Sequence, residues 1–283
     1  DPEKVTHAFA DAIRRKKGRV ITNCAVLGVE TKAGAVCGIS TEQGFVTANT
    51  VVVAAGAWTS QVLSWLNINL PQMRVRGTVG RTMPTSKVSD IAAWTPHLGF
   101  VQRKDGCFTF SGLDVSDFDV SLDAIRHAKY YLPTFMKHRD MVQLQFGHPF
   151  LLDLIGRIPG TEAMRDPLHR ARISEPMPNP KKLKSTLEEL RGLFGVTHDV
   201  QLKKAWGGHI EMTPDMLPVI DGDVGASGLI VVTGLSGHGF GIGPGVGSLV
   251  AEIAAGDTPS VDLQPFRLSR FAEGDWDEPY NLI

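Results

Sequence analysis

The residues best suited to chemistry lie in a glycine-rich stretch near the end of the chain, from Gly228 to Gly256. The seven glycines between 234 and 247 exceed the one or two that a tight strand–helix turn needs. Such a bare backbone lets a flat or anionic ligand reach main-chain N–H groups, and a following helix points its positive dipole end at that ligand. We therefore predict a cofactor-binding loop here, with a plain turn as the alternative.

The elements around this loop are predicted from hydrophobic periodicity and turn residues. A buried strand at Leu229–Val232 precedes the loop, and a helix begins near Pro244 and ends at Gly256, with Leu249, Val250 and Ile253 as its apolar stripe. Further helices are predicted at 1–17, from Trp58 through Leu66, at 121–139 and at 182–193. Strands are predicted at 19–21, 25–31, 35–41, 44–48, 50–55, 77–83, 99–103, 107–111 and 201–212, and 147–181 reads as irregular.

These elements predict an α/β (α+β) fold with two parts. A discontinuous cofactor-binding domain is expected from 1–66 and 205–260, with an antiparallel-sheet substrate domain at 67–204 between them and a tail at 261–283. A dinucleotide-binding fold normally opens with G-x-G-x-x-G after its first strand, and no such spacing occurs in this sequence. The chain therefore looks like the later part of a cofactor-binding enzyme.

Composition excludes several classes of function. The formal net charge of −1 gives no electrostatic footprint for nucleic acid, and no apolar run is long enough to span a membrane. Cys24, Cys37 and Cys107 are too few and too widely spaced for a disulfide framework or a metal site. We expect no metal and a cytoplasmic location, or a peripheral one at the inner membrane.

Four blocks of sequence carry a resemblance to a known family. They are Ala25-Val-Leu-Gly-Val-Glu30, Val51-Val-Val-Ala-Ala-Gly-Ala-Trp58, Trp206-Gly-Gly-His-Ile-Glu-Met-Thr-Pro-Asp215 with Pro218, and the glycine loop. In this order and spacing they resemble the FAD-dependent amine and amino-acid oxidoreductases, such as D-amino-acid, glycine and sarcosine oxidases. The resemblance covers nearly the whole chain and implies part of a Rossmann-like FAD-binding domain, without the N-terminal segment that carries G-x-G-x-x-G.

The resemblance implies which residues contact FAD. They are Val26 against the adenine, and Ala55, Gly56, Trp58, Gly208, Leu235, Ser236, Gly237, His238, Gly239, Phe240 and Gly241 elsewhere. Main-chain N–H groups at 237–241 would stabilise the negative charge of the reduced flavin. Gly208 stands where sarcosine oxidase-like members attach the flavin through cysteine, so FAD should be non-covalent.

The substrate side departs further from the family. Ile210 stands where glycine oxidase-like members bind the substrate carboxylate with arginine, and Gly241 stands where sarcosine oxidase-like members have lysine. Either the carboxylate is held elsewhere or the substrate differs. The catalytic candidates are His209, Glu211 and His238, and the substrate-binding candidates are Ile210 and Arg103. Arg76 and Arg81 are further residues that could reach a carboxylate. Each has a structural alternative: His209 as a packed histidine, and Arg103 as a surface charge at a hairpin.

The leading interpretation is an enzyme that oxidises the C–N bond of an amino acid or secondary amine by hydride transfer to FAD. It would pass electrons to O2 or to a quinone or other electron-transfer partner. Two alternatives remain at this point. One is a family-derived binding module without turnover; the other is one piece of a split or truncated enzyme, inactive without its N-terminal segment or a partner chain.

Overall fold

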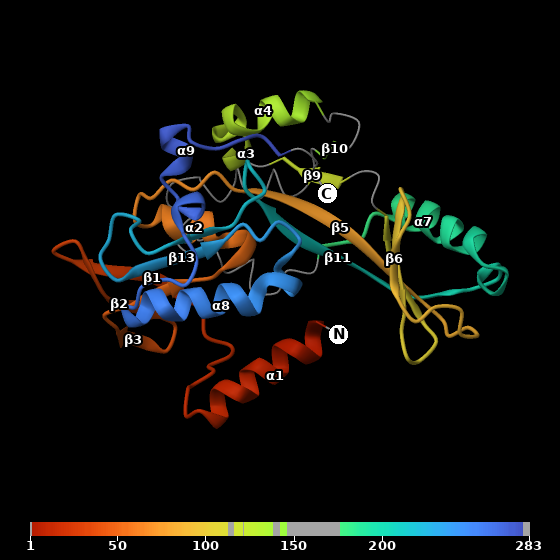
Figure 1. The fold of residues 1–283 in the computed structure, drawn as a ribbon, viewed down its shortest axis with the longest axis horizontal. Coiled ribbons are helices and arrows are strands. Elements are labelled where there is room, and N and C mark those ends of the chain that lie inside the picture. The colour runs from red at the N-terminus through yellow and green to blue at the C-terminus, as the bar shows by residue number, and fades with distance from the viewer. Residues whose placement is uncertain (1, 113–115, 121, 138–141, 146–175, 280–283) are drawn as a thin grey trace. The chain divides into compact units, whose positions relative to one another are not determined.

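A computed structural model describes residues 2–112, 116–120, 122–137, 142–145 and 176–279 (Figure 1). The chain divides into two compact units. The first contains 1–70 and 218–275, and the second contains 71–217 and 276–283. Helices and strands are mixed in both units, which confirms the predicted α/β (α+β) class.

The first unit is built from two small sheets and several helices. Its antiparallel meander contains β1 (Val26–Lys32), β2 (Ala35–Thr41) and β3 (Gly44–Thr47). Its second sheet has the order β12–β13–β4, where β12 is Val219–Asp221, β13 is Leu229–Thr233 and β4 is Val51–Val53. The helical elements are α1 (Pro2–Arg15), η1 (Gly56–Trp58), α2 (Thr59–Ser64), α8 (Gly239–Ala255), η4 (Gln264–Phe266) and α9 (Arg270–Glu273).

The core of the first unit forms where α8 packs on the second sheet. Ile220, Ile230, Val232 and Val246 are each at most 9% exposed, and the predicted apolar stripe of the helix packs against them. All five residues of β13 are buried, as expected for a strand covered on both faces. This core fixes the loop between β13 and α8 at one end of the sheet.

The second unit is organised around a seven-stranded sheet of order β10–β9–β5–β8–β7–β6, with β11 on the other side of β5. Only the β9–β10 pair is parallel. The strands are β5 (Met73–Thr82), β6 (Ala92–Trp94), β7 (Leu98–Gln102), β8 (Phe108–Gly112), β9 (Ser116–Asp119), β10 (Val142–Gln145) and β11 (Leu202–Met212). The helical elements are α3 (Leu122–Arg126), α4 (Ala128–Lys137), α7 (Pro180–Leu193) and η3 (Gly195–Thr197).

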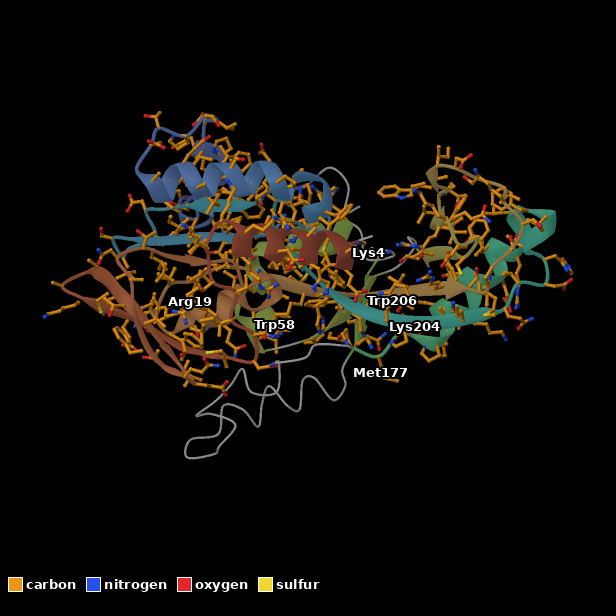
Figure 2. All side chains as sticks on the ribbon, turned by 90° about the horizontal axis from the view of Figure 1, so that it is seen from below. Lys4, Arg19, Trp58, Met177, Lys204 and Trp206 are labelled. Carbon is orange, nitrogen blue, oxygen red and sulfur yellow. The ribbon has the colours of Figure 1, made fainter. Side chains whose placement is uncertain are left out.

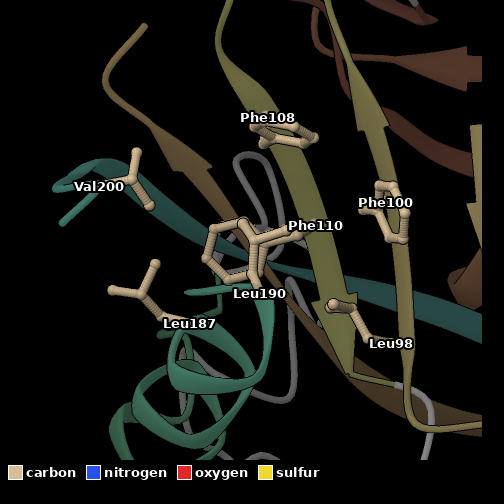
Figure 3. Packing of buried hydrophobic residues seen from close by; sticks show 7 residues of the cluster. All are labelled: Leu98, Phe100, Phe108, Phe110, Leu187, Leu190 and Val200. Carbon is tan, nitrogen blue, oxygen red and sulfur yellow. The ribbon is translucent and has the colours of Figure 1, made fainter. Parts of the chain in front are cut away.

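Helix α7 covers one face of this sheet. Leu187 and Leu190 pack against aromatic side chains of β7 and β8, among them Phe108 and Phe110, which are at most 1% exposed (Figure 3). Asn179 begins the helix, since its side-chain oxygen accepts hydrogen bonds from the N–H groups of Lys181 and Lys182. A second cluster, on the opposite face and around Val75 and Met212, packs near α3.

Three expectations need correction. Residues 19–21 form no strand, because Lys17 and Asn23 on either side adopt positive φ (66° and 54°) and no described strand pairs with them. Helix α8 begins at Gly239, five residues before Pro244, which lies inside the helix. The predicted helix at 121–139 is two helices, interrupted at His127.

The division between the units also differs from the predicted boundary at 204/205. It falls at 217/218, because β11 pairs with β5 along its length, from Leu202 opposite Thr82 to Met212 opposite Met73. The predicted irregular excursion at 147–181 lies outside the described residues up to 175. The role of each unit in binding FAD or substrate stays a prediction.

Candidate cofactor and substrate sites

In the first unit, two of the predicted cofactor segments lie side by side. Strands β4 and β13 are parallel neighbours, with Val51, Val52 and Val53 opposite Leu229, Ile230 and Val231. Their carboxyl ends therefore meet at one edge, where ligands bind in open α/β sheets. Ala55, Gly56 and Trp58 follow β4, and the 234–238 loop follows β13. The Thr233 Oγ1 donates to the Gly56 carbonyl over 3.3 Å and links the two segments.

The loop itself is a sequence of tight turns that only some of its glycines require. Gly234, Ser236 and Gly237 have φ values of 71°, 47° and 85°, in the left-handed region that favours glycine. The His238 N–H donates to the Leu235 carbonyl over 2.8 Å. The remaining glycines, from 239 to 247, lie within α8 at negative φ, so their role is to leave the helix surface bare.

The start of α8 offers unsatisfied hydrogen-bond donors. The first N–H groups of a helix have no intrahelical acceptor, and no side chain caps this one. The N–H groups of Gly241 and Ile242 donate to the His238 carbonyl, at 3.0 and 3.2 Å, so they do not face a ligand. Among the described residues, the N–H groups of Gly237, Gly239 and Phe240 have no acceptor, so three of the five donors in the expected 237–241 set are free. With the helix dipole they suit an anionic or electron-rich group.

Val26, which was predicted to contact the adenine, lies in the antiparallel meander of the first unit. It begins β1 opposite Thr41 and is 36% exposed. The predicted cofactor residues His238 and Phe240, which lie at the start of α8, are also exposed, with Phe240 at 61%. These side chains are accessible within the first unit, as cofactor contacts must be.

In the second unit, β11 separates the predicted substrate residues onto two faces. Side chains alternate along a strand, and directly paired residues share a face. Gly207, His209 and Glu211 lie on one face, which we call the covered face. Trp206, Gly208 and Ile210 lie on the other, which we call the open face. The sequence-based list combined residues from both faces.

The covered face lies under residues 176–179. A Cβ atom added to Gly207 would come 2.3 Å from the Pro176 carbonyl oxygen. Arg76, opposite His209 on β5, donates to the Met177 carbonyl over 2.8 Å. The Asn179 N–H donates to the Thr78 Oγ1 over 2.9 Å. His209 and Glu211 are thus partly enclosed, away from Gly208 and Ile210.

A polar network that sequence reasoning missed ties this segment to β9. Asp117 is fully buried, and its carboxylate lies 2.9 Å from the Lys182 Nζ. It also accepts hydrogen bonds from the side-chain nitrogens of Asn179, at 3.1 Å, and Gln145, at 3.2 Å. The neighbouring Asp119 pairs with Arg76 over 3.2 Å. The alternating acids of Asp117-Phe-Asp119 were the available signal, because period-two acids on a strand share one face.

His209 is electrostatically unsuited to act as an acid at neutral pH. Burial, together with the positive charges of Arg74 and Arg76, lowers the pKa of its imidazole to about 4. The ring is therefore neutral at pH 7 and can only hydrogen-bond or accept a proton weakly. Glu211 faces Arg74 across the strand pair. This arrangement supports a positioning role for His209.

The open face carries a bare patch of backbone. Gly208 is paired with Gly77, and a Cβ atom added to Gly208 would meet no atom of the described residues within 4 Å. At Gly77 the nearest atom would be the Ile210 Cδ1 at 3.7 Å. Gly77 was not among the predicted residues, although a glycine in mid-strand signals a close approach by a ligand or backbone. Ile210 borders this patch with an apolar side chain.

Of the two remaining arginine candidates, Arg103 lies in the turn of the β7–β8 hairpin, and Arg81 lies on β5 with its guanidinium directed at that turn. The Arg103 N–H donates to the Cys107 carbonyl over 2.8 Å at this turn, and the Arg81 guanidinium pairs with the Asp105 carboxylate. His209 is opposite Arg76, whereas Arg81 is opposite Thr109 of β8. Five residues at ~3.3 Å separate Arg76 from Arg81, or roughly 16 Å. The structure does not bring Arg103 to His209.

The comparison with known protein families covers the parallel strand pair, its glycine loop and most of the adjoining helix. A family model described as FAD dependent oxidoreductase matches residues 1–253. The chain belongs to this family. FAD is therefore its cofactor, and the uncapped start of α8 beside Gly56 fits a group with an electron-rich edge.

The family relatives act on amino acids and amines. The human peroxisomal sarcosine oxidase is 26% identical over 271 residues, which are 95% of this chain and 59% of that protein. The N-methyl-L-tryptophan oxidase of Salmonella newport is 51% identical over 61 residues, 22% of this chain and 16% of that protein. The structure of L-amino acid deaminase from Proteus vulgaris matches with a TM-score of 0.86 and 25% identity, covering 96% of this chain and 63% of that one.

The chain thus spans about three-fifths of the length of the human oxidase (59%) and of the deaminase (63%). Within the described part of the chain, no helix is both long and apolar enough to cross a membrane. The same residues contain no group of histidine, cysteine and acidic side chains that could hold a metal ion.

Proposed function

We propose that the protein oxidises the C–N bond of an amino acid or secondary amine, with non-covalently bound FAD as the electron acceptor. The observation that carries the proposal is the parallel pair β4–β13, whose carboxyl ends join the Gly56 turn to the uncapped start of α8. When bound, FAD would supply a two-electron acceptor for a hydride from the carbon next to nitrogen, and loss of the proton on nitrogen would leave an imine. Water then hydrolyses this imine.

The residues of the first unit would hold and polarise the cofactor. The N–H groups of Gly239 and Phe240 would donate to the electron-rich edge of the ring, and Gly56 and Trp58 would line it from the neighbouring strand end. Exposed His238 is available to contact the same group. Gly208 has no nucleophilic side chain, so no thioether to the flavin can form at this position.

The residues of the second unit would receive the substrate on the open face of β11. The Gly77–Gly208 patch admits a flat amine or carboxylate against the backbone, and Ile210 supplies an apolar wall. Because position 210 has no guanidinium to pair with a carboxylate, glycine and sarcosine should bind weakly. His209 and Glu211 on the covered face would fix the strand through Arg76 and Arg74.

The proposal is tested with the FAD-loaded protein under anaerobic conditions. We expect an added secondary amine or larger amino acid to bleach the flavin absorbance near 450 nm, and glycine and sarcosine to do so slowly. Acid precipitation should release yellow flavin into the supernatant. Reduction by 2-hydroxy acids alone would contradict the amine assignment, and flavin retained in the pellet would contradict non-covalent binding.

A further inference from the structure

A single row of residues crosses the open face of the second unit's sheet. Cross-strand pairing links one residue of each of the strands β11, β5, β8, β7 and β6, in the order Trp206, Val79, Ser111, Gly99 and Trp94. Indoles stand at both ends of the row, and the residues between them are small. Trp94 is 71% exposed. Because paired side chains share a face, the row forms a shallow floor between two aromatic ends.

The next row begins with two cations. Lys204 is paired with Arg81, which in turn is opposite Thr109. The Arg81 guanidinium is neutralised by the Asp105 carboxylate. Lys204 is exposed, and among the described residues no carboxylate forms an ion pair with it. Its side chain therefore presents an uncompensated positive charge on the open face.

The Lys204 ammonium turns back toward the glycine patch. Its Nζ lies 5.9 Å from the centre of the Trp206 ring, and Figure 2 shows the two residues beside each other on β11. Trp206 precedes Gly208 by two residues, or about 6.6 Å along a strand. Lys204 itself precedes Gly208 by four residues, or about 13 Å, so a ligand whose reacting carbon lies over Gly208 would reach the ammonium with a group roughly 7–13 Å away.

We infer that Lys204 determines specificity by binding a second acidic group of the substrate. This inference rests on the proposed function and narrows its substrate class to amino acids or secondary amines that carry a distal carboxylate. The substituent would lie along the small residues of the row, and its carboxylate would pair with the ammonium above the indole. Ile210, which lacks a charge, would then not need to bind an acid at the other end of the patch.

The experiment uses two matched probes and two matched variants. The probes are N-(3-carboxypropyl)glycine and its uncharged distal amide, which differ only in the group expected to meet Lys204. The variants are Lys204→Ala and Lys203→Ala, which remove the same charge from adjacent exposed residues. The first measurement is kcat/KM for anaerobic flavin reduction by each probe. The second is the degree to which each probe protects each lysine from acetylation by the N-hydroxysuccinimide ester of acetic acid, measured by mass spectrometry.

We expect Lys204→Ala to lower kcat/KM for the acid by roughly fivefold, the upper range for an exposed ion pair, and to leave kcat/KM for the amide unchanged. Lys203→Ala should change neither. The acid probe should protect Lys204 from acetylation more than Lys203. Equal responses of both probes to Lys204→Ala, or equal protection of both lysines, would overturn the inference. If neither probe reduces the flavin, the protection measurement still decides whether Lys204 binds the acid, and the proposed function fails separately only if no other amine or amino acid reduces the flavin.

Discussion

Adjacent glycines of β11 allow a direct test of which face of this strand is covered. In Gly207→Ala the new methyl group would point at the Pro176 carbonyl oxygen, 2.3 Å away, and at its carbonyl carbon, 3.0 Å away. In Gly208→Ala the methyl group would lie on the other face, where no atom of the described part of the chain comes within 4 Å. The two variants make the same chemical change at neighbouring positions of one strand. Only the surroundings of the added carbon differ.

The expected magnitudes follow from these contacts. Neither glycine has positive φ, so alanine fits both backbones and should gain about 0.4–1 kcal/mol through a less flexible unfolded chain. In Gly207→Ala a backbone carbonyl must also move, and such overpacking costs about 1–3 kcal/mol. Because the gain is common to both variants, we expect their free energies of unfolding to differ by the overpacking cost alone, about 1–3 kcal/mol, with Gly208→Ala the more stable.

Thermal unfolding of the two variants and the parent, followed by circular dichroism, measures this difference. For a unit of this size it corresponds to roughly 2–12 °C in melting temperature. Gly208→Ala should nevertheless slow amine oxidation, because its methyl group occupies the proposed substrate patch. Equal melting temperatures for both variants would refute the assignment of the covered and open faces.

Other predictions concern the buried network, the buried histidine and the helix start. Asp117→Asn should destabilise the protein by about 3–5 kcal/mol in urea titration, because Lys182 loses its buried counter-ion; a loss under 1 kcal/mol would show that the network is not stabilising. The pKa of His209, about 4 against 6.5 in the unfolded chain, means that stability falls as pH drops from about 6.5 to 4, so His209→Gln should lose less stability in this window. Identical pH profiles of stability for His209→Gln and the parent would show that His209 does not cause the loss of stability. Gly239→Val should lower the FAD bound per chain, measured by absorbance near 450 nm, because its Cβ would lie 3.0 Å from Leu235 beside the free N–H groups; unchanged FAD content would contradict the helix-start site.

Local chemistry made much of the fold predictable. The buried run before Thr233, the apolar stripe of α8 and the turn at Lys104-Asp105-Gly106 all appear where sequence periodicity and turn residues indicate. Pro244 misled the placement of the helix start, since proline fits a first turn well. Here the helix extends five residues further toward the N-terminus, through glycines with low helix propensity.

The candidate site was only partly accessible from sequence. Period-two alternation correctly placed His209 and Glu211 on one face, and it also implies that Gly208 and Ile210 lie on the other. Which face is open depends on residues 176–179, which lie 23 to 26 positions before the start of β11. No local sequence pattern indicates where residues 176–179 lie on the sheet. The network around Asp117 was missed for the same reason, since its donors come from β10 and α7.

The most direct test of the account is anaerobic stopped-flow reduction of the FAD-loaded protein by an amine and by the same amine deuterated at the carbon next to nitrogen. We predict loss of the absorbance near 450 nm, with slower reduction for the deuterated amine because the C–H bond breaks in this step. An oxidised flavin spectrum that no amine or amino acid changes would contradict the proposed function.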